Sequence, residues 1–276
     1  MIETIFLFLT GISPKLKRNL WRWWYQFIAK LYQKNDWQFM NYGFCDLNSE
    51  LSPINLSEND EINRYFIQLY HYVITSTDIE ENDFSTKKVL EVGCGRGGGA
   101  SYIAKYFNPK HMMGLDFSEE NIKLSEEFSN LPNLSFQRGD AENLPFDNDT
   151  FDIIINVESS HCYYSMDKFV SEVARVLKPQ GIFSWTDFRP RNDIEILEES
   201  FQQSGLIQLK KANITPNVLK ALSLVNEYKE NMINKNVSPI IKETFREFAG
   251  VENGKMFKAF KSCEIVYLSY VFQKKN

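Results

Sequence analysis

A run of glycines follows a short apolar segment in VLEVGCGRGGG, residues 89–99. Gly93, Gly95 and Gly98 match the G-x-G-x-x-G fingerprint of a dinucleotide site. Gly93, Gly95 and Gly97 equally match the G-x-G-x-G spacing of an S-adenosylmethionine site. Bare backbone of this kind lets a ligand lie against the turn from a strand into a helix. The loop therefore predicts a nucleotide-like cofactor and leaves open which of the two it is.

Two acidic residues near this loop suit a cofactor that carries an ammonium group and a ribose. Glu91 precedes Gly93 by two residues, where a dinucleotide loop more often has an apolar side chain. Its carboxylate can face the ammonium of S-adenosylmethionine. Asp116 ends the second predicted strand and suits the ribose hydroxyls of either cofactor. Glu91 thus favours the sulfonium compound, whereas Asp116 does not discriminate.

Further candidates for cofactor binding stand at the ends of the neighbouring strands. In GDAENLPFDNDTFD, Asp140 can accept a hydrogen bond from the adenine amino group, and the Ala141 amide can bond the ring. Phe117 can pack on the face of the adenine. Asn156, near the end of the fourth strand, can offer its side-chain carbonyl to the ammonium. An ordinary strand-end role is the alternative for each residue, but strand ends are where such sheets bind ligands.

One of the three histidines stands where a general base would be needed. An alcohol that receives a methyl group must lose its proton, and a side chain of near-neutral pKa accepts that proton best. Only His161 directly follows the fourth strand, and Asp187 ends the neighbouring fifth strand, where it can orient His161. Glu158 is an alternative base or a structural hydrogen-bonding residue. The set predicts acid–base chemistry, and we expect no metal because no second acidic cluster stands nearby.

These side chains need a sheet to position them, and apolar strands alternate with helical stretches from Lys87 onward. The helix expected at 118–130 begins at Ser118, a good N-cap residue, and the helix before the fifth strand should be stopped by Pro179 and Gly181. The pattern predicts a doubly wound α/β fold with ligands at the carboxyl ends of its strands. The expected strands are residues 88–92, 111–117, 134–140, 151–157, 181–188 and a final, antiparallel 263–273.

Two regions outside this alternation are expected to cover the site. Residues 1–86 form an N-terminal helical lid or extension ahead of a cofactor-binding domain at 87–276. Residues 192–262 look mostly helical and are expected to form a cap before the last strand. Residues 1–34 are rich in Trp, Tyr, Lys and Arg. That composition suits either a lid over an apolar pocket or a helix lying on an anionic membrane surface.

Composition excludes some classes of partner. Of 276 residues, 43% are hydrophobic and 24% are charged, and the net charge is −5, so we do not expect the chain as a whole to bind nucleic acid. The four cysteines form no C-x-x-C pair, which fits a reducing compartment. The apolar run at 5–9 is far shorter than the about 20 residues that span a bilayer. We expect a cytoplasmic protein, with peripheral membrane contact as a further hypothesis.

Four segments taken in order, VLEVGCGRGGG, GLDFS, GDAENLPFDNDTFDIIINVESSHCY and EVARVLKPQGIFSWTDFRP, resemble a class I methyltransferase. More narrowly, the chain is similar to the phthiotriolone/phenolphthiotriolone dimycocerosate O-methyltransferases, and this likeness includes KRNLWRWWY near the start and REFAGV near the end. Antibiotic sugar O-methyltransferases are more distant. The resemblance implies a Rossmann-like sheet of seven strands, S-adenosylmethionine as cofactor and methylation of a hydroxyl on a long lipid.

The resemblance also implies roles for particular residues. His161 and Asp187 match the His of ESxH and the Asp of DF in the sugar O-methyltransferases, where they are the base and its partner. Cys162 stands where that family often has a second histidine, which leaves His161 as the main candidate. Tyr42, in Asn41-Tyr42-Gly43, matches a segment that closes over the cofactor in relatives, so Tyr42 is expected to touch the methionine carboxylate.

The sequence is compatible with several functions. The first is O-methylation, dependent on S-adenosylmethionine, of an apolar small molecule, lipid or polyketide-like natural product. A C-methyltransferase of the sterol or quinone type is a neighbouring alternative, because aromatic side chains such as Tyr163, Tyr164 and Trp185 can shelter a carbocation. An NAD-dependent oxidoreductase and a membrane-associated binding module without turnover belong to other classes. The oligomeric state is left undetermined.

Overall fold

The computed structural model describes residues 37–49, 51, 54–239 and 241–276. Residues 1–34, for which the sequence predicts a lid or a membrane-surface helix, lie outside this part of the chain, so both hypotheses stay predictions. Within the described ranges, no helix has the length and apolar character needed to cross a membrane.

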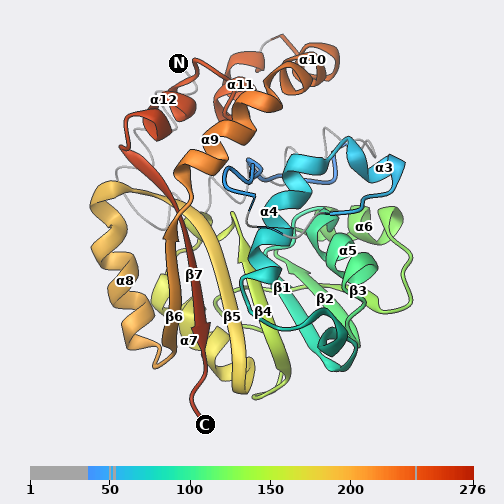
Figure 1. Ribbon diagram of the computed structural model, residues 1–276, viewed down its shortest axis with the longest axis vertical. Helices are drawn as coiled ribbons and strands as arrows, with labels where there is room; N and C mark the ends of the chain where they lie inside the picture. The colour runs from blue at the N-terminus through green and yellow to red at the C-terminus, as the bar shows by residue number, and fades with distance from the viewer. Residues whose placement is uncertain (1–36, 50, 52–53, 240) are drawn as a thin grey trace.

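One mixed sheet of seven strands forms the centre of the molecule (Figure 1). Its strand order is β3-β2-β1-β4-β5-β7-β6, and β7 alone runs antiparallel to its neighbours. Because the order reverses between β1 and β4, the carboxyl ends of these two strands flank the place where such sheets bind ligands. The strands are β1 Lys88–Val92, β2 His111–Asp116, β3 Leu134–Arg138, β4 Phe151–Val157, β5 Leu177–Pro190, β6 Ile207–Asn213 and β7 Ile265–Gln273.

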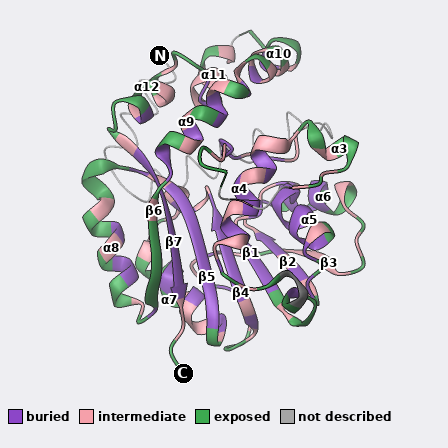
Figure 2. Ribbon diagram, viewed as in Figure 1, coloured by how far each residue is buried: buried purple, intermediate pink, exposed green. Residues whose placement is uncertain are grey.

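Helices cover both faces of this sheet and explain its apolar strands. Helices α4 (Arg64–Thr75) and α5 (Gly98–Tyr106) pack on one face, where Val89 of β1 joins their core. Helices α7 (Met166–Val176) and α8 (Ile194–Gln203) pack on the other, with Leu90 and Val92. Successive strand residues thus point into different cores, which is the period of two expected of a strand buried on both sides. Figure 2 shows the central strands buried and β6 exposed.

The helices begin and end largely as the sequence predicts. Helix α6 (Glu119–Phe128) lies beside β2 and β3, and the Ser118 hydroxyl accepts a hydrogen bond from the Asn121 N–H at 3.3 Å. This confirms the predicted N-cap. Helix α7, however, ends at Val176, because Leu177 already pairs with Phe151 in the sheet. Pairing with β4, rather than Pro179, therefore ends that helix.

A group of four helices lies over the carboxyl edge of the sheet, and we call residues 215–261 the cap (Figure 1). Its helices are α9 Thr215–Leu224, α10 Asn226–Asn236, α11 Lys242–Ala249 and α12 Lys255–Lys261. The expected cap at 192–262 was too long, because it contains α8 on the sheet face and β6 at the sheet edge. β6 is exposed over nearly its whole length. A strand buried on neither face has no strong apolar pattern by which to recognise it.

The segment before the sheet belongs partly to the same core. Helix α4 contributes Leu69, Val73 and Ile74, all fully buried, to the cluster that includes β1 and β4. It therefore forms part of the helical layer of the sheet, while the residues ahead of it, 37–49, pass beneath the cap. The short helices of the described chain are α3 Glu58–Glu61 and the 3-10 turns η1 Glu81–Thr86, η2 Ser160–Cys162 and η3 Arg191–Asp193.

Candidate active site

A cavity of about 1030 Å³ opens at the carboxyl ends of β1 to β4, and we call it the cofactor cavity. It is lined by residues from the glycine loop, the ends of β2 and β3 and the loop after β4. Six of the predicted cofactor residues are in its wall. They are Gly93, Gly95, Asp116, Phe117, Asp140 and Ala141.

The glycine loop is shaped by positive backbone angles. Gly93 has φ +78°, and a Cβ placed there would meet the Ser159 hydroxyl at 2.3 Å, so only glycine fits. Gly97 has φ +76° and precedes the first residue of α5, but a Cβ there would strike Phe136 rather than the cavity. Gly93 therefore shapes the wall of the cofactor cavity, whereas Gly97 shapes the turn behind it.

Asp116 is held in a fixed orientation at the end of β2. Its carboxylate accepts hydrogen bonds from the Gly95 N–H at 2.9 Å, the Ser118 N–H at 2.8 Å and the Asn121 side-chain amide at 3.3 Å. Burial raises the pKa of this carboxyl, and the same three hydrogen bonds oppose the rise by stabilising the charged form. The group is thus a pre-oriented acceptor for hydroxyl donors in the cavity.

Glu91 and Asn156 lie beneath the cavity wall instead of in it. The Glu91 carboxylate is fully buried and accepts from the Tyr70 hydroxyl at 2.8 Å, and burial raises its pKa to about 8. Asn156 is fully buried too, and its amide donates to the Val92 carbonyl at 2.8 Å and to Ser159 at 2.7 Å. Neither side chain lines the cavity. The direct contacts with an ammonium group that the sequence predicts for Glu91 and Asn156 therefore do not fit this geometry. Tyr70 lines the wall where Glu91 was expected.

Several lining residues were missed by sequence reasoning. Gln38 and Met40 close the cavity from a segment about fifty residues before the glycine loop, and no local motif marks them. Asn41 lines the cavity beside them, in the Asn41-Tyr42-Gly43 segment from which only Tyr42 was predicted to touch the cofactor. Arg96 stands inside the loop itself, stacks over the Trp37 ring at 4.9 Å and donates to the Trp37 carbonyl at 3.2 Å. A charged residue amid the glycines was the signal that could have identified Arg96.

The lining residues fit S-adenosylmethionine. The bare backbone at Gly93 makes room for an elongated ligand, and Asp116 presents a carboxylate suited to two ribose hydroxyls. Phe117 and Ala141 supply an apolar face and a backbone amide next to Asp140, a combination that suits an adenine ring.

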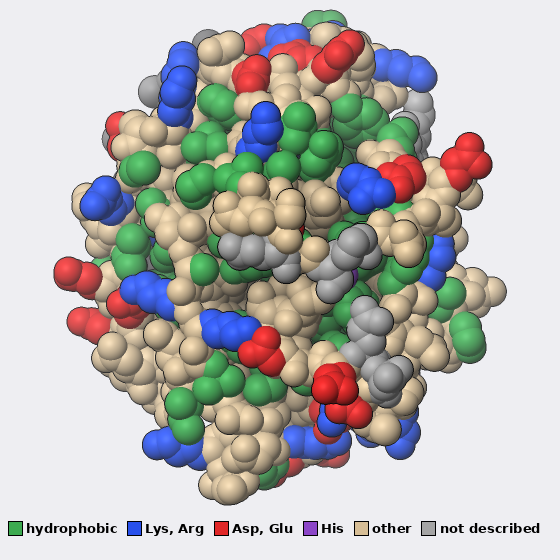
Figure 3. All heavy atoms as spheres, in the orientation of Figure 1, with side chains coloured by type: hydrophobic (Ala, Val, Ile, Leu, Met, Phe, Trp, Pro, Cys, Tyr) green, Lys and Arg blue, Asp and Glu red, His purple; other side chains and the backbone are tan. Residues whose placement is uncertain are grey.

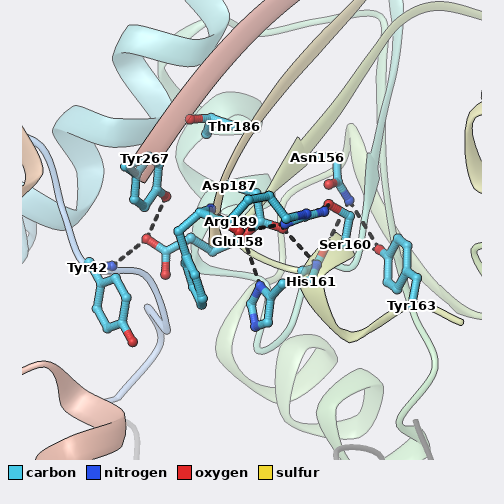
Figure 4. Close-up of polar contacts among 12 residues, drawn as sticks. Tyr42, Asn156, Glu158, Ser160, His161, Tyr163, Thr186, Asp187, Arg189 and Tyr267 are labelled. Atoms are coloured by element: carbon cyan, nitrogen blue, oxygen red, sulfur yellow. Dashed lines mark hydrogen bonds and ion pairs between the residues drawn. The ribbon is translucent and has the colours of Figure 1, made fainter. Parts of the chain in front are cut away.

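His161 and Asp187 meet at the carboxyl edge between β4 and β5, as predicted (Figure 4). His161 Nδ1 lies 2.8 Å from Asp187 Oδ1, and the His161 backbone N–H donates to Oδ2 at 2.9 Å. Asp187 is fully buried, and Ser160 and Arg189 also contact its carboxylate, at 2.8 and 3.0 Å. Burial alone would raise the pKa of Asp187, but the positive charges of His161 and Arg189 and the hydrogen bonds hold it well below its usual range.

The neighbours of His161 raise the pKa of its imidazole to about 10. Burial disfavours the charged imidazolium, but the neighbouring Cys162 sulfur and the Asp187 carboxylate outweigh that cost. The ring packs against Phe188 with centroids 4.3 Å apart, and its side chain is 12% exposed. His161 is not itself in the wall of the cofactor cavity, although Glu158 and Cys162 on either side of it are.

Glu158 holds a strained position at the end of β4. Its backbone φ is +44°, which non-glycine residues rarely adopt. Oε1 accepts from the Tyr42 backbone N–H at 2.7 Å and from the Tyr267 hydroxyl at 2.6 Å (Figure 4). Burial raises the pKa of Glu158 to about 7 against these two hydrogen bonds. Tyr42 thus reaches the site through its backbone, while its hydroxyl donates to the Phe248 carbonyl and its ring lies outside the cofactor cavity.

A metal site is not formed by the described residues, since no group of three His, Cys, Asp or Glu side chains among them converges on one point. Three titratable side chains, Glu158, His161 and Asp187, meet at this edge of the sheet and contact backbone, hydroxyl and guanidinium donors.

Comparison with known proteins identifies the family. Residues 90–185 match the family model described as a methyltransferase domain. The chain is 36% identical over 269 residues to a phthiotriol/phenolphthiotriol dimycocerosates methyltransferase of Mycobacterium leprae, covering 98% of this chain and 97% of that protein. It is also 36% identical over 252 residues to a fatty-acid O-methyltransferase of Mycolicibacterium smegmatis, covering 91% and 88%.

The fold is shared with solved methyltransferases of much lower sequence identity. Geranyl diphosphate C-methyltransferase of Streptomyces coelicolor A3(2), solved with S-adenosyl-L-homocysteine, superposes with a TM-score of 0.63 at 15% identity, over 91% of this chain and 97% of that one. These findings decide between the two cofactors in favour of S-adenosylmethionine, and they confirm the predicted Rossmann-like sheet. The chain belongs to the family of S-adenosylmethionine-dependent methyltransferases that includes the mycobacterial phthiotriol/phenolphthiotriol dimycocerosates methyltransferases.

Proposed function

We propose that this enzyme methylates a hydroxyl oxygen of an apolar small molecule, lipid or polyketide-like natural product, with His161 as general base and Asp187 as its partner. The observation that carries the proposal is the 2.8 Å contact between His161 Nδ1 and Asp187 at the carboxyl edge of β4 and β5. The names of the two relatives support it, because both describe methyltransferases that act on lipids.

Bound S-adenosylmethionine supplies an electrophilic methyl group on a positively charged sulfur. The protein must hold the acceptor oxygen about 3 Å from that methyl group and in line with the leaving sulfur. This positioning excludes unproductive geometries. In this proposal Gly93 and Gly95 cradle the methionine part, Asp116 binds the ribose hydroxyls, and Asp140 with Ala141 and Phe117 binds the adenine.

The His161–Asp187 pair would remove the acceptor proton. A hydrogen bond from Nδ1–H to Asp187 fixes the tautomer and leaves Nε2 as the ring nitrogen that takes up a proton. The buried carboxylate stabilises the imidazolium that results, and together with the neighbouring Cys162 sulfur it raises the pKa of His161. Arg189 and Ser160 hold the carboxylate itself in place.

Glu158 is the second candidate for the base. It lines the cofactor cavity, and a pKa of about 7 suits proton transfer at neutral pH. Against this role, Oε1 already accepts two hydrogen bonds, from Tyr42 and Tyr267. We therefore assign Glu158 a positioning role, in which it holds the Tyr42 backbone and the Tyr267 hydroxyl beside the reaction site.

Substitution of His161 tests the proposal. His161→Ala should lower kcat for methylation of long-chain alcohols by about 10²- to 10⁴-fold, while the affinity for S-adenosylhomocysteine changes less than about twofold. His111→Ala is the matched control, because His111 lies at the far end of β2 and contacts Ser135. An unchanged kcat in His161→Ala would remove His161 as the base. A variant that still methylates alkenes at the parental rate would point to the C-methyltransferase alternative.

A further inference from the structure

A second cavity, of about 500 Å³, lies beside the first and shares Met40 and Asn41 with it. We call it the Lys229 cavity. It is enclosed by residues 37–42, α4, α10 and α11. Figure 3 shows hydrophobic side chains gathered in the upper part of the molecule, in the area where α4 and the cap approach each other. The walls of the Lys229 cavity are mainly aromatic and thioether side chains, among them Trp37, Phe39, Phe66, Tyr228, Met232 and Phe248.

One lysine is buried in this apolar wall. Lys229 of α10 is only 6% exposed, and its Nζ donates to the Ala249 carbonyl at 2.9 Å. The same nitrogen lies 5.5 Å from the ring centroids of both Tyr42 and Phe66. Among the described residues, no carboxylate lies within ion-pair distance of it. Lysines are almost never this buried unless an acid pairs with them.

The contacts of Lys229 leave its charge only partly compensated. A lysine ammonium has three N–H donors, and the structure gives Nζ one hydrogen bond, to a neutral carbonyl at the end of α11. That carbonyl carries the partial negative charge of a helix C-terminus, and the two aromatic faces add cation–π attraction. Burial lowers the pKa of Lys229 to about 8, with the charge of Glu158 opposing the shift, so the ammonium form still predominates at neutral pH.

Tyr42 connects this lysine to the reaction site. Its backbone N–H bonds Glu158 at 2.7 Å, while its ring faces Nζ and also packs on Phe188 at 5.6 Å between centroids. Phe188 in turn contacts the His161 ring. The Lys229 cavity thus adjoins the acceptor side of the site, where an apolar acceptor would have to lie.

We propose that Lys229 binds a carboxylate of the methyl acceptor, so that the enzyme acts on aliphatic hydroxy acids in preference to neutral alcohols. A carboxylate would accept the remaining N–H donors and neutralise the buried charge, and the aromatic walls would enclose the aliphatic chain. This inference rests on the proposed function for the position of the methyl-accepting hydroxyl. A structural role, in which Lys229 only caps α11, is the competing explanation.

Equilibrium binding to the complex with S-adenosylhomocysteine separates the two explanations. The probes are dodecanoate and dodecanol, which share an aliphatic chain and differ in charge. The parent should bind dodecanoate at least tenfold more tightly than dodecanol. Lys229→Met should lose at least tenfold in affinity for dodecanoate and less than twofold for dodecanol, and Lys229→Arg should keep the preference. Lys235→Met, at an exposed position on the same helix, should behave as the parent.

Two results would overturn the inference. One is a parent protein that binds both probes equally, which needs no variant and so does not depend on the folding of Lys229→Met. The other is an equal loss of both probes in Lys229→Met, as expected of a lysine that only supports α11. Because neither measurement involves turnover, a protein that prefers dodecanoate but methylates no hydroxyl would contradict the proposed function and leave the carboxylate site standing.

Discussion

The two sides of the active site draw their residues from different distances along the chain. In the cofactor cavity, Asp116 is held by backbone N–H groups 21 and 2 residues away, in Gly95 and Ser118. On the acceptor side, Glu158 is held by Tyr42 and Tyr267, which lie 116 and 109 residues away. The part of the cofactor cavity that carries the glycine loop and Asp116 is therefore a local product of consecutive strand–helix units, and residues 38–41 complete its wall. Glu158, which lines the same cavity on the side of His161, is held in place only once β7 and residues 37–45 have come together.

This difference separates cofactor binding, which is common to the family, from acceptor binding, which is specific to each enzyme. A ligand common to a family can be bound by motifs that recur at fixed spacing in one stretch of sequence. An acceptor that differs between relatives is bound where distant segments meet, so a change in any one of them alters the pocket without disturbing the cofactor. Variants on the acceptor side should accordingly change catalysis and leave cofactor affinity intact, and variants on the cofactor side should do the reverse.

After His161→Ala, the largest effect is expected from Asp187→Asn, which should lower kcat by about 10³-fold because the neutral amide no longer stabilises the imidazolium. It should also change the pH profile. His161 acts as a base only when neutral, and Asp187 helps to raise its pKa to about 10. Activity of the parent should therefore rise with pH through the alkaline range. In the variant this rise of kcat/KM with pH, the acid limb of the pH profile, should occur at lower pH.

The measurement is kcat/KM between pH 6 and pH 10.5, with the affinity for S-adenosylhomocysteine as the control for folding, since Arg189 loses its ion-pair partner. An acid limb at the same pH in both proteins would contradict the assignment of this limb to His161.

On the cofactor side, Asp116→Ala should weaken binding of S-adenosylhomocysteine by about 100-fold, because charged hydrogen-bond partners contribute most among such contacts. Calorimetric titration measures the loss directly. Asp78→Ala, which removes an exposed carboxylate paired with Lys210, should leave the affinity unchanged. If both variants bind the ligand as the parent does, the cofactor does not depend on the end of β2.

Glu158→Gln should lower kcat/KM by about tenfold, because the amide oxygen can still accept from Tyr42 and Tyr267 but no longer as a charged group. Steady-state kinetics at pH 8 measure this, with cofactor affinity expected to stay within about twofold. A loss near 10³-fold together with the disappearance of an acid limb near pH 7 would reverse the roles and make Glu158 the base.

The smallest effect is expected from Tyr267→Phe, which removes one of the two hydrogen bonds on Glu158 Oε1. A single buried hydrogen bond contributes about 1 kcal/mol, so kcat/KM should fall about fivefold. Because this hydrogen bond lowers the pKa of Glu158, its removal should raise that pKa further. A weaker affinity for S-adenosylhomocysteine in this variant would show that the two sides of the site are coupled.

Much of the cofactor side could be predicted from the sequence. The strand periodicity, the glycine spacing and the acids at strand ends are local signals, and they placed Gly93, Asp116 and Asp140 around one cavity. The pairing of His161 with Asp187 also followed from strand order, since β4 and β5 are neighbours in a parallel sheet.

Other features could not be predicted because they depend on tertiary contacts. The strand position of Glu91 is right, but its side chain points to the face on which Tyr70 packs, and only the position of α4 determines that. The lining by Gln38 and Met40 and the burial of Lys229 likewise depend on contacts between segments far apart in the sequence. β6 was missed because its residues are exposed and so carry no burial pattern.

The exposed β6 has a consequence for how the molecule behaves in a crowded solution. As the last strand of the sheet, it turns one row of backbone N–H and C=O groups toward solvent, which is a template for strand addition by another chain. A register shift between Gln208 and Lys210 interrupts the ladder, and Lys210 and Lys211 put charge on the edge. Irregular pairing and like charges both discourage a second copy from docking there, so β6 completes the sheet without inviting polymerisation.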